Sequence, residues 1–320
     1  MLKNWVFDLE AIRVKGLPRR LNKKSFIALK ELLIGLRQAG KLIDSFKPDL
    51  VIGTGGFVSG PVLFRAAIKG YKTMIHEQNS LPGLTNRILS RFVNTVAVTY
   101  ESSKTYFKHP DRVRVTGNPI RAALDRITKS EASYNKYSLN SDKPVVFSFG
   151  GSNGSEELND AIAQMIIEKS GNLNFQLLHA TGENHYKSFC EKINVADMDG
   201  IRIEPYIHDI SKAYDISDLT IASSGAITLA EISLLGLPSI LIPKAYTTEN
   251  HQEYNARLYV EIGASEMILE DDLNSEVLYN KIEDILKDEN TLAIMGENAR
   301  KLGNPDATSD IADLAFSLIK

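Results

Sequence analysis

The residues that say most about chemistry lie between Thr220 and Glu231 (TIASSGAITLAE). An apolar run over residues 219–222 stops at Ser223-Ser224-Gly225, and a helical segment follows at once. Small residues at such a turn let a ligand approach the backbone, and the N–H groups at a helix start suit a phosphate. Glu231 follows about one turn into the helix, where its carboxylate could accept both hydroxyls of a ribose. The pattern indicates a nucleotide site, although an ordinary strand–turn–helix with a solvated Glu231 uses the same residue types.

A second turn of this kind is the sequence GGSNG at residues 150–154, which follows an apolar run and opens another helix. Its glycines permit tight backbone geometry, and the hydroxyl of Ser152 can donate to a phosphate oxygen. The spacing differs from the G-x-G-x-x-G dinucleotide fingerprint. We expect this turn and the one at Ser224 to flank a single crevice at neighbouring strand ends.

Two polar stretches also follow predicted strands. The sequence HEQN at residues 76–79 suits a sugar or an acid–base role, and a structural polar loop is the alternative. Residues 249–255 (ENHQEYN) carry amides of the kind that read sugar hydroxyls, or they are simply a helix start capped by Asn250.

The elements that must position these residues alternate between strands and helices, as in doubly wound α/β folds. In the first block we predict strands at residues 50–54, 73–76 and 95–99, with helices at 58–69 and 83–92. In the second we predict strands at 144–149, 175–179, 201–203, 219–222 and 239–242, with a helix from Glu156. Residues 116–119 (TGNP) are a candidate hinge. The expected domains are residues 1–121, with a C-terminal helix at 306–320 packing on them, and 122–305.

Charge is unevenly spread along this chain of 320 residues with a net charge of −3. The segment from Arg13 to Lys41 holds nine basic residues and one acidic residue, Glu31, which points to an anionic partner. Apolar residues between 26 and 36 are spread too widely for one helical stripe, so part of them should face the core and the rest could lie on a membrane surface. The sequence has no run of about 20 apolar residues, no zinc-type spacing, no P-loop and no G-x-S-x-G motif. Cys190 is the lone cysteine, which favours a reducing compartment.

With these motifs in order, the chain resembles the MurG family of bacterial peptidoglycan glycosyltransferases, which have the GT-B fold of two Rossmann-like domains. The similar segments run along essentially the whole chain: GGFVSGP at 55–61, HEQN at 76–79, PGLTN at 82–86, GNPIR at 117–121, GGSNG at 150–154 and SGAITLAE at 224–231. Each motif is weak alone, and their joint order is specific.

The resemblance implies transfer of N-acetylglucosamine (GlcNAc) from UDP-GlcNAc to lipid I (undecaprenyl-pyrophosphoryl-MurNAc-pentapeptide), making lipid II with inversion. It also implies a peripheral protein on the cytoplasmic face of the bacterial membrane, with Arg13 to Lys41 on the anionic surface. It implies no metal or other cofactor and no nucleic acid. The implied donor-binding residues are Asn79, Arg121, Ser152, Ile207, Ala226, Ile227, Thr228, Leu229, Ala230, Glu231 and Gln252.

Two departures from the family pattern matter. Ser223 stands where many members have arginine, and the family's opening strand with its GG-x-x-GH loop has no counterpart here. That loop carries a candidate base, so Glu77 is the remaining base candidate. We therefore expect a first domain truncated at its N-terminus that keeps donor binding and is poor in transfer. The alternatives are a non-catalytic binder of UDP-sugars or membrane, and a related lipid glycosyltransferase with another acceptor.

Overall fold

The structure is a computed structural model that describes residues 8–15, 23–121, 124, 128–169, 173–193 and 198–320, with only the backbone described for residues 23–26 and Thr248. The chain divides into two compact units, residues 1–116 with 309–320 and residues 117–308. These limits differ by a few residues from the predicted boundaries at 121 and 305. Both units are α/β, as predicted, and the described strands in each form a parallel sheet.

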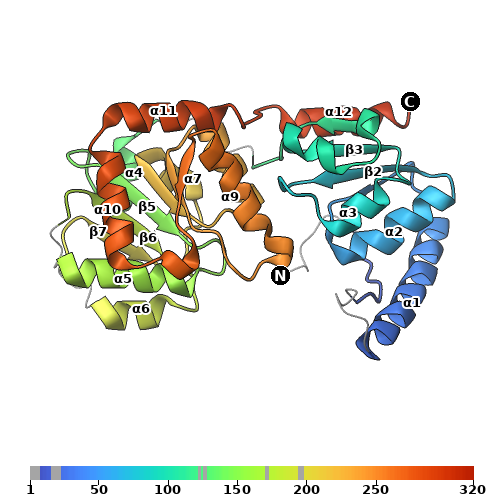
Figure 1. Cartoon of the computed structure of the whole chain (residues 1–320), viewed down its shortest axis with the longest axis horizontal. Coiled ribbons are helices and arrows are strands. Elements are labelled where there is room, and N and C mark those ends of the chain that lie inside the picture. The colour runs from blue at the N-terminus through green and yellow to red at the C-terminus, as the bar shows by residue number, and fades with distance from the viewer. Residues whose placement is uncertain (1–7, 16–22, 122–123, 125–127, 170–172, 194–197) are drawn as a thin grey trace. The chain divides into compact units, whose positions relative to one another are not determined.

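The first unit has a four-stranded sheet in the order β1-β2-β3-β4. Its elements are α1 (Lys23–Phe46), β1 (Leu50–Gly53), α2 (Gly56–Ile68), β2 (Lys72–Glu77), α3 (Leu84–Leu89), β3 (Thr95–Val98), the 3₁₀ helices η1 (Glu101–Tyr106) and η2 (Pro110–Arg112), β4 (Val113–Val115) and α12 (Ala307–Ser317). Apolar side chains of α12 pack on β2 and β3 through Met74 and Ala97. Helices α2 and α3 cover the other face, as Figure 1 shows. The predicted C-terminal helix thus lies against this sheet.

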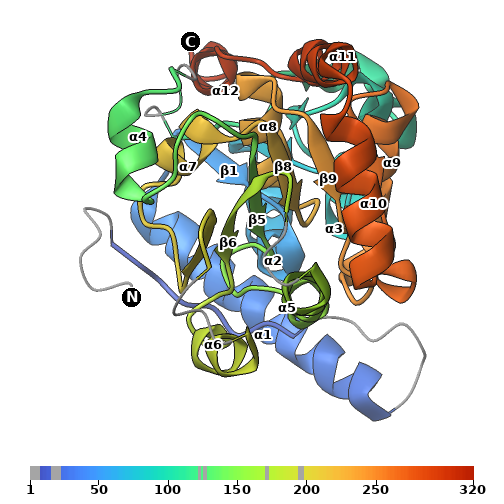
Figure 2. The same ribbon diagram turned by 90° about the vertical axis from the view of Figure 1, so that its left-hand side faces the viewer.

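The second unit has a six-stranded sheet in the order β10-β9-β8-β5-β6-β7. Its elements are α4 (Glu131–Lys136), β5 (Val145–Phe149), α5 (Glu156–Lys169), β6 (Gln176–Ala180), α6 (Tyr186–Ile193), β7 (Ile201–Glu204), α7 (Ile210–Ile216), β8 (Leu219–Ala222), α8 (Ala226–Leu235), β9 (Ser239–Leu241), η4 (Thr248–Asn250), α9 (His251–Glu261), β10 (Ser265–Met267), η5 (Glu270–Asp272), α10 (Ser275–Leu286) and α11 (Glu289–Arg300). Figure 2 shows the sheet between α5 and α10 on one side and α7 and α8 on the other. Because helices cover both faces of the sheet, every residue of the central strands β5 and β8 is buried, and most of these residues are apolar.

The predicted strands and helices are present, with ends that shift by a residue or a few. Sequence reasoning missed β4 (VRV) and β10 (SEM), each of which has three residues and lies at the edge of its sheet. Strands this short carry too few residues to show an alternating or continuous apolar pattern. The basic helix α1 is longer than the predicted apolar segment, and it buries a narrow face that includes Ala28, Ala39 and Ile43.

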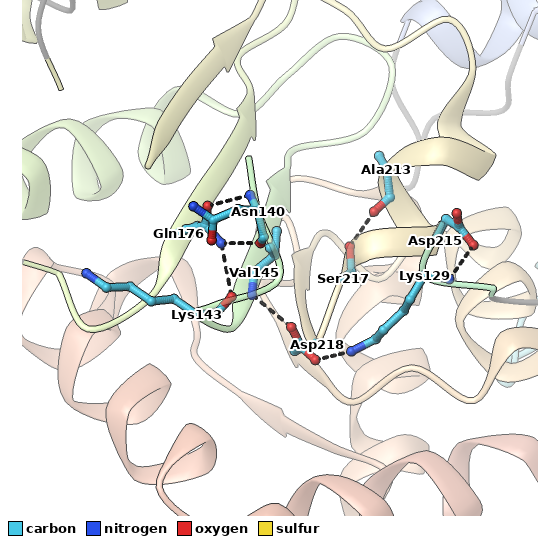
Figure 3. Close-up of polar contacts among 9 residues, drawn as sticks. All are labelled: Lys129, Asn140, Lys143, Val145, Gln176, Ala213, Asp215, Ser217 and Asp218. Carbon is cyan, nitrogen blue, oxygen red and sulfur yellow. Dashed lines mark hydrogen bonds and ion pairs between the residues drawn. The ribbon is translucent and has the colours of Figure 1, made fainter. Parts of the chain in front are cut away.

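Polar contacts fasten the segment before β5 to the second unit (Figure 3). The side chain of Gln176 accepts from the backbone of Asn140 and donates to its carbonyl and to that of Lys143. Asp218 accepts from the backbone N–H of Val145 at 2.8 Å and from the ammonium of Lys129. These bonds fix the start of β5 and hence the glycine turn that follows its other end.

Asp215 is the anchor of the same segment. Its carboxylate accepts from the hydroxyls of Thr128, Ser130 and Ser133 and from three backbone N–H groups, including that of Lys129. Burial alone would raise the pKa of this carboxyl. The hydrogen bonds lower the pKa by more than burial raises it, so the pKa lies below its ordinary value. This buried acid is ionised and fully engaged in holding the fold.

Candidate nucleotide-binding site

The second sheet has a topological switch point between β5 and β8. From β5 the chain proceeds to β6 and β7 on one side, and the later strands β8, β9 and β10 lie on the other. Because all these strands are parallel, the turns after β5 and β8 leave the same edge of the sheet next to each other. Ligands of doubly wound proteins bind in the crevice that such a switch point opens.

The turn after β5 presents backbone to this crevice. Gly154 donates its N–H to the carbonyl of Gly151 at 3.0 Å, and both residues have positive φ angles of 76° and 81°. A Cβ atom on Gly150 would lie 2.2 Å from the N–H nitrogen of Ser155, so only glycine fits there. The tight turn leaves Ser152 exposed at its tip. Ser152 is therefore accessible to a ligand.

The turn after β8 ends at the start of helix α8. Gly225 occupies the N-cap position, and because glycine has no side chain, the cap residue accepts no side-chain hydrogen bond from the first helical N–H groups. The N–H groups of Ala226, Ile227 and Thr228 lie in this first turn, where the helix dipole favours an anion. The preceding Ser224 is buried, and its hydroxyl donates to the carbonyl of Gln252 at 2.7 Å. The helix start is thus held firmly and offers donors that the helix itself does not use.

The two turns lie in contact at the sheet edge. A Cβ atom on Gly151 would lie 3.3 Å from the hydroxyl oxygen of Ser223, which is itself almost fully buried. Ser223 contributes no charge at this position, where the sequence resemblance leads one to expect arginine in many relatives. A neutral small side chain allows the glycine turn to approach α8 closely. The two turns that flank the predicted crevice therefore belong to the second unit and lie next to each other.

Glu231 lies in the second turn of α8 and is buried. Its carboxylate accepts from the hydroxyl of Tyr214 at 2.9 Å, and Nε of Arg121 lies 3.8 Å from its other oxygen. Burial raises the pKa of Glu231, and the hydrogen bond from Tyr214 and the charge of Arg121 oppose that rise without cancelling it. Burial also raises the pKa of Tyr214 well above its ordinary value, so that its hydroxyl stays a donor. The carboxylate is thus desolvated and has acceptor capacity that the described side chains leave unused.

The other predicted donor residues of this unit have different surroundings. Ala226, Thr228 and Ala230 are partly exposed and Ile227 is half exposed. Leu229 is fully buried and its N–H donates to Gly225 at 3.0 Å, so it serves to hold the helix start. This burial counts against Leu229 as a residue that contacts a ligand directly.

Gln252 and Ile207 flank the strand ends on opposite sides. The amide oxygen of Gln252 accepts from the N–H of Lys244 at 3.0 Å, which ties the start of α9 to the end of β9. Ile207 follows β7 and is partly exposed, and the rings of its sequence neighbours Tyr206 and His208 contact each other edge-on. Ile207 thus lies past the end of β7, at the side of the sheet away from β9.

Glu77 and Asn79 belong to the first unit. Glu77 is buried at the end of β2, and one carboxylate oxygen accepts from the backbone and the side chain of Asn79 at 3.0 and 3.1 Å. The other oxygen accepts from the N–H of Gly83 at 3.0 Å and from the side chain of Asn86 at 2.7 Å. Four donors use the acceptor capacity of a carboxylate. The geometry therefore gives Glu77 the role of shaping the loop that carries Asn79, which weakens its case as a general base.

Two residues near the crevice escaped sequence reasoning. Tyr214, whose hydroxyl donates to Glu231, lies in α7, and its sequence position is typical of an aromatic residue of the core. Lys244 comes directly after Pro243 beyond the end of β9, and its ammonium donates to the carbonyl of Gly154 at 2.7 Å. Lys244 follows a predicted strand, as the two turns do, and this position is the sequence signal that could have identified it.

The chain has two α/β units, each with a sheet of parallel strands, and the second sheet has a topological switch point. These features, and the likeness to a solved MurG structure, define a GT-B glycosyltransferase fold. The chain matches the glycosyltransferase family 28 N-terminal domain over residues 4–98 and the family 28 C-terminal domain over residues 145–311. The chain therefore belongs to glycosyltransferase family 28.

The relatives carry a more specific name. The chain is 51% identical to a "UDP-N-acetylglucosamine--N-acetylmuramyl-(pentapeptide) pyrophosphoryl-undecaprenol N-acetylglucosamine transferase" of Finegoldia magna, over 98% of this chain and 85% of that protein. It is 43% identical to the protein of the same name from Acetivibrio thermocellus, with the same coverage. Among solved structures, MurG of Acinetobacter baumannii matches with a TM-score of 0.74 and 27% identity, over 93% of this chain and 82% of that one.

Proposed function

We propose that this protein transfers GlcNAc from UDP-GlcNAc to lipid I, the reaction that forms lipid II in peptidoglycan synthesis. The observation that carries the proposal is the buried, under-coordinated carboxylate of Glu231 beside the uncapped start of α8. A ribose supplies two hydroxyl donors and a diphosphate supplies acceptors. Together they complement a carboxylate and a row of N–H groups. The names of the relatives given above support the same donor and acceptor.

In this proposal the second unit holds the donor. Glu231 accepts the ribose hydroxyls, and the N–H groups of Ala226, Ile227 and Thr228 bind the diphosphate together with the hydroxyl of Ser152. The resemblance to the MurG family also implies backbone contacts of Ile207 to uracil and contacts of Arg121 and Gln252 to the sugar.

The chemistry is an in-line displacement at the anomeric carbon of GlcNAc. A general base takes the proton of the acceptor hydroxyl, and the hydroxyl oxygen forms the new bond to the anomeric carbon. The bond from that carbon to the β-phosphate oxygen breaks at the same time, and UDP leaves with the bonding electrons. Negative charge then grows on the departing diphosphate. N–H groups already aimed at that position stabilise the charge without reorganising, which favours the transition state over the bound substrate.

The test is transfer of labelled GlcNAc from UDP-GlcNAc to a lipid I analogue, with the Glu231→Ala variant beside the wild type. We expect the wild type to form the lipid II analogue with inverted configuration at the anomeric carbon, and the variant to need more donor. Binding of UDP-GlcNAc without transfer would make the protein a binder of UDP-sugars. Failure to bind UDP at all would refute the nucleotide site itself.

We also propose that the segment from Arg13 to Lys41 places the protein peripherally on an anionic membrane, at its cytoplasmic face. Among the described helices, none is long and apolar enough to cross a bilayer. Helix α1 exposes Ile27, Leu29, Lys30, Leu33, Arg37 and Lys41. The acidic Glu31 is paired with Arg13 at 3.1 Å, so it does not offset the other charges. Arg19, Arg20 and the side chains of Lys23 and Lys24 lie outside the described residues.

Co-sedimentation with vesicles tests this surface. Each basic residue near an anionic surface contributes about 1 kcal/mol, and salt screens the attraction. We expect binding to vesicles with anionic lipid that fades with added salt, and little binding to neutral vesicles. Equal binding to both would show that charge is not the cause.

A further inference from the structure

Lys244 spans the crevice of the second unit. It follows β9, and its backbone N–H donates to the side chain of Gln252 at 3.0 Å. Its side chain reaches back to the turn after β5, where the ammonium donates to the carbonyl of Gly154 at 2.7 Å. The residue is only partly exposed. Both ends of Lys244 are thus fixed by bonds.

The sheet order shows what this side chain crosses. In the sheet order β9-β8-β5, strand β8 lies between β9, which precedes Lys244, and β5, which precedes Gly154. All three are parallel, so their carboxyl ends share one edge. The bond between Lys244 and Gly154 therefore joins chain segments on either side of the end of β8, where Ser223 and Gly225 lead into α8.

The glycine turn is held at both of its ends. At one end Gly151 lies against Ser223, and at the other Gly154 accepts from Lys244. Ser152 is exposed between these two contacts. The hydroxyl of Ser152, the first N–H groups of α8 and the ammonium of Lys244 thus surround the same turn.

The charge of Lys244 is available to a ligand. Among the described residues no carboxylate forms an ion pair with Lys244, and its ammonium has three donor hydrogens, of which Gly154 uses one. Glu270 lies near enough to be affected: burial raises its pKa, and the charge of Lys244 opposes that rise. The carboxylate of Glu270 is itself engaged by the N–H of Ala245 at 2.7 Å. The glycine turn and Ser223 bring no charge of their own.

We propose that Lys244 binds the diphosphate of the donor nucleotide, an inference that rests on the proposed function of this crevice. The ammonium keeps its bond to Gly154 and turns its remaining hydrogens to the phosphate oxygens above the start of α8. It supplies the full positive charge that helix dipoles and neutral hydroxyls do not. Such a charge-assisted bond strengthens as negative charge grows on the departing diphosphate.

Calorimetry with UDP, UMP and uridine tests the proposal, using wild type, Lys244→Gln and Lys192→Met. Glutamine keeps a donor for Gly154 and removes the charge. The control Lys192→Met removes the same charge from α6, where Lys192 forms an exposed ion pair with Asp160 of α5. We expect Lys244→Gln to weaken UDP about tenfold or more and to leave uridine unchanged. UMP should fall between them, and Lys192→Met should leave the whole series at wild-type affinity.

Other outcomes distinguish a failure of the Lys244 proposal from a failure of the proposed nucleotide site. If Lys244→Gln weakens uridine as much as UDP, the lysine only holds the glycine turn and the proposal is wrong. If it weakens neither, the ammonium does not contact the diphosphate. Failure of the wild type to bind either UDP or uridine would instead refute the nucleotide site. Should Lys244→Gln unfold, Lys244→Arg keeps the charge, and UDP affinity near the wild-type value is then required.

Discussion

Each unit buries a glutamate beside the turn that follows a strand, yet the two carboxylates are coordinated very differently. Glu77 at the end of β2 is 2% exposed and accepts four hydrogen bonds, from Asn79, Gly83 and Asn86. Glu231 in α8 is 3% exposed, and the described residues give it one hydrogen bond and a looser ion pair at 3.8 Å. Burial is the same in both cases. Coordination is what distinguishes them.

The difference separates a structural acid from a binding acid. A carboxylate offers about four acceptor sites, and a buried one is costly unless they are used. Asp215 belongs with Glu77, since its many hydrogen bonds outweigh burial and hold its pKa below the ordinary value. Glu231 shows the reverse, because burial prevails and raises its pKa. Donors from a ligand would complete the coordination of Glu231, whereas Glu77 has nothing to gain from one.

The largest expected effect is the loss of stability in Glu77→Ala. The substitution leaves the N–H groups of Gly83, Asn86 and the backbone of Asn79 without their acceptor. We therefore expect a loss of about 3 kcal/mol or more in the free energy of unfolding. Denaturant titration followed by circular dichroism measures it. UDP affinity of the folded fraction should stay at the wild-type value, because the nucleotide residues belong to the other unit. Wild-type stability together with loss of transfer would restore Glu77 as a base.

Glu231→Ala should show the opposite pattern. Loss of a charge-assisted hydrogen bond costs about 1.5–3 kcal/mol, so UDP affinity should fall roughly ten- to a hundredfold. Stability should change little, because the carboxylate removed is desolvated and poorly coordinated. Calorimetry and thermal unfolding on the same samples measure both quantities. Unchanged UDP affinity would contradict the assignment of Glu231 to the ribose. A large loss of stability would mean that Glu231, like Glu77, has a structural role.

The sequence predicted the two strand-end turns of the second unit better than the coordination of the acids. The turns at 150–154 and 223–225 were found because glycine and serine after an apolar strand are local signals, and the family motifs reinforced them. The coordination of Glu77 depends on Gly83 and Asn86, and that of Glu231 on Tyr214, so it follows from how the chain folds back on itself. Lys244 was missed for the same reason, since its partner Gly154 is 90 residues away in the chain.

The pH dependence of uridine binding sharpens the comparison, because uridine has no phosphate to titrate. Burial places the pKa of Glu231 above its ordinary 4.5, and the charged form is the better acceptor for ribose hydroxyls. Affinity should therefore fall as the pH drops through that raised pKa, by less than the loss in Glu231→Ala. The Glu231→Gln variant should show a flat profile over the same window. A fall in the variant as well would assign the titration to another group.

Stability should respond to the same acids with opposite signs. Between 4.5 and the raised pKa of Glu231, the folded state binds a proton that the unfolded state does not, so lowering the pH stabilises the fold through this residue. Asp215 has a folded pKa below its ordinary 3.8, so its contribution is lost as the pH falls under that value. Denaturant unfolding of Glu231→Gln and Asp215→Asn against pH measures the two differences from wild type. Equal signs in both variants would contradict the contrast.

The smallest effect is expected for Tyr214→Phe, which removes the hydroxyl that donates to Glu231. Tyr214 is fully buried, and losing its hydrogen bond should cost about 1 kcal/mol of stability. That bond also lowers the pKa of Glu231, so its removal should shift the midpoint of uridine binding to higher pH. At a pH well above that midpoint the carboxylate is charged and gains an acceptor site, so uridine affinity should remain close to wild type there. A loss of affinity in that range equal to that of Glu231→Ala would mean that Tyr214 positions the carboxylate. An unshifted midpoint would mean that their hydrogen bond has no part in tuning it.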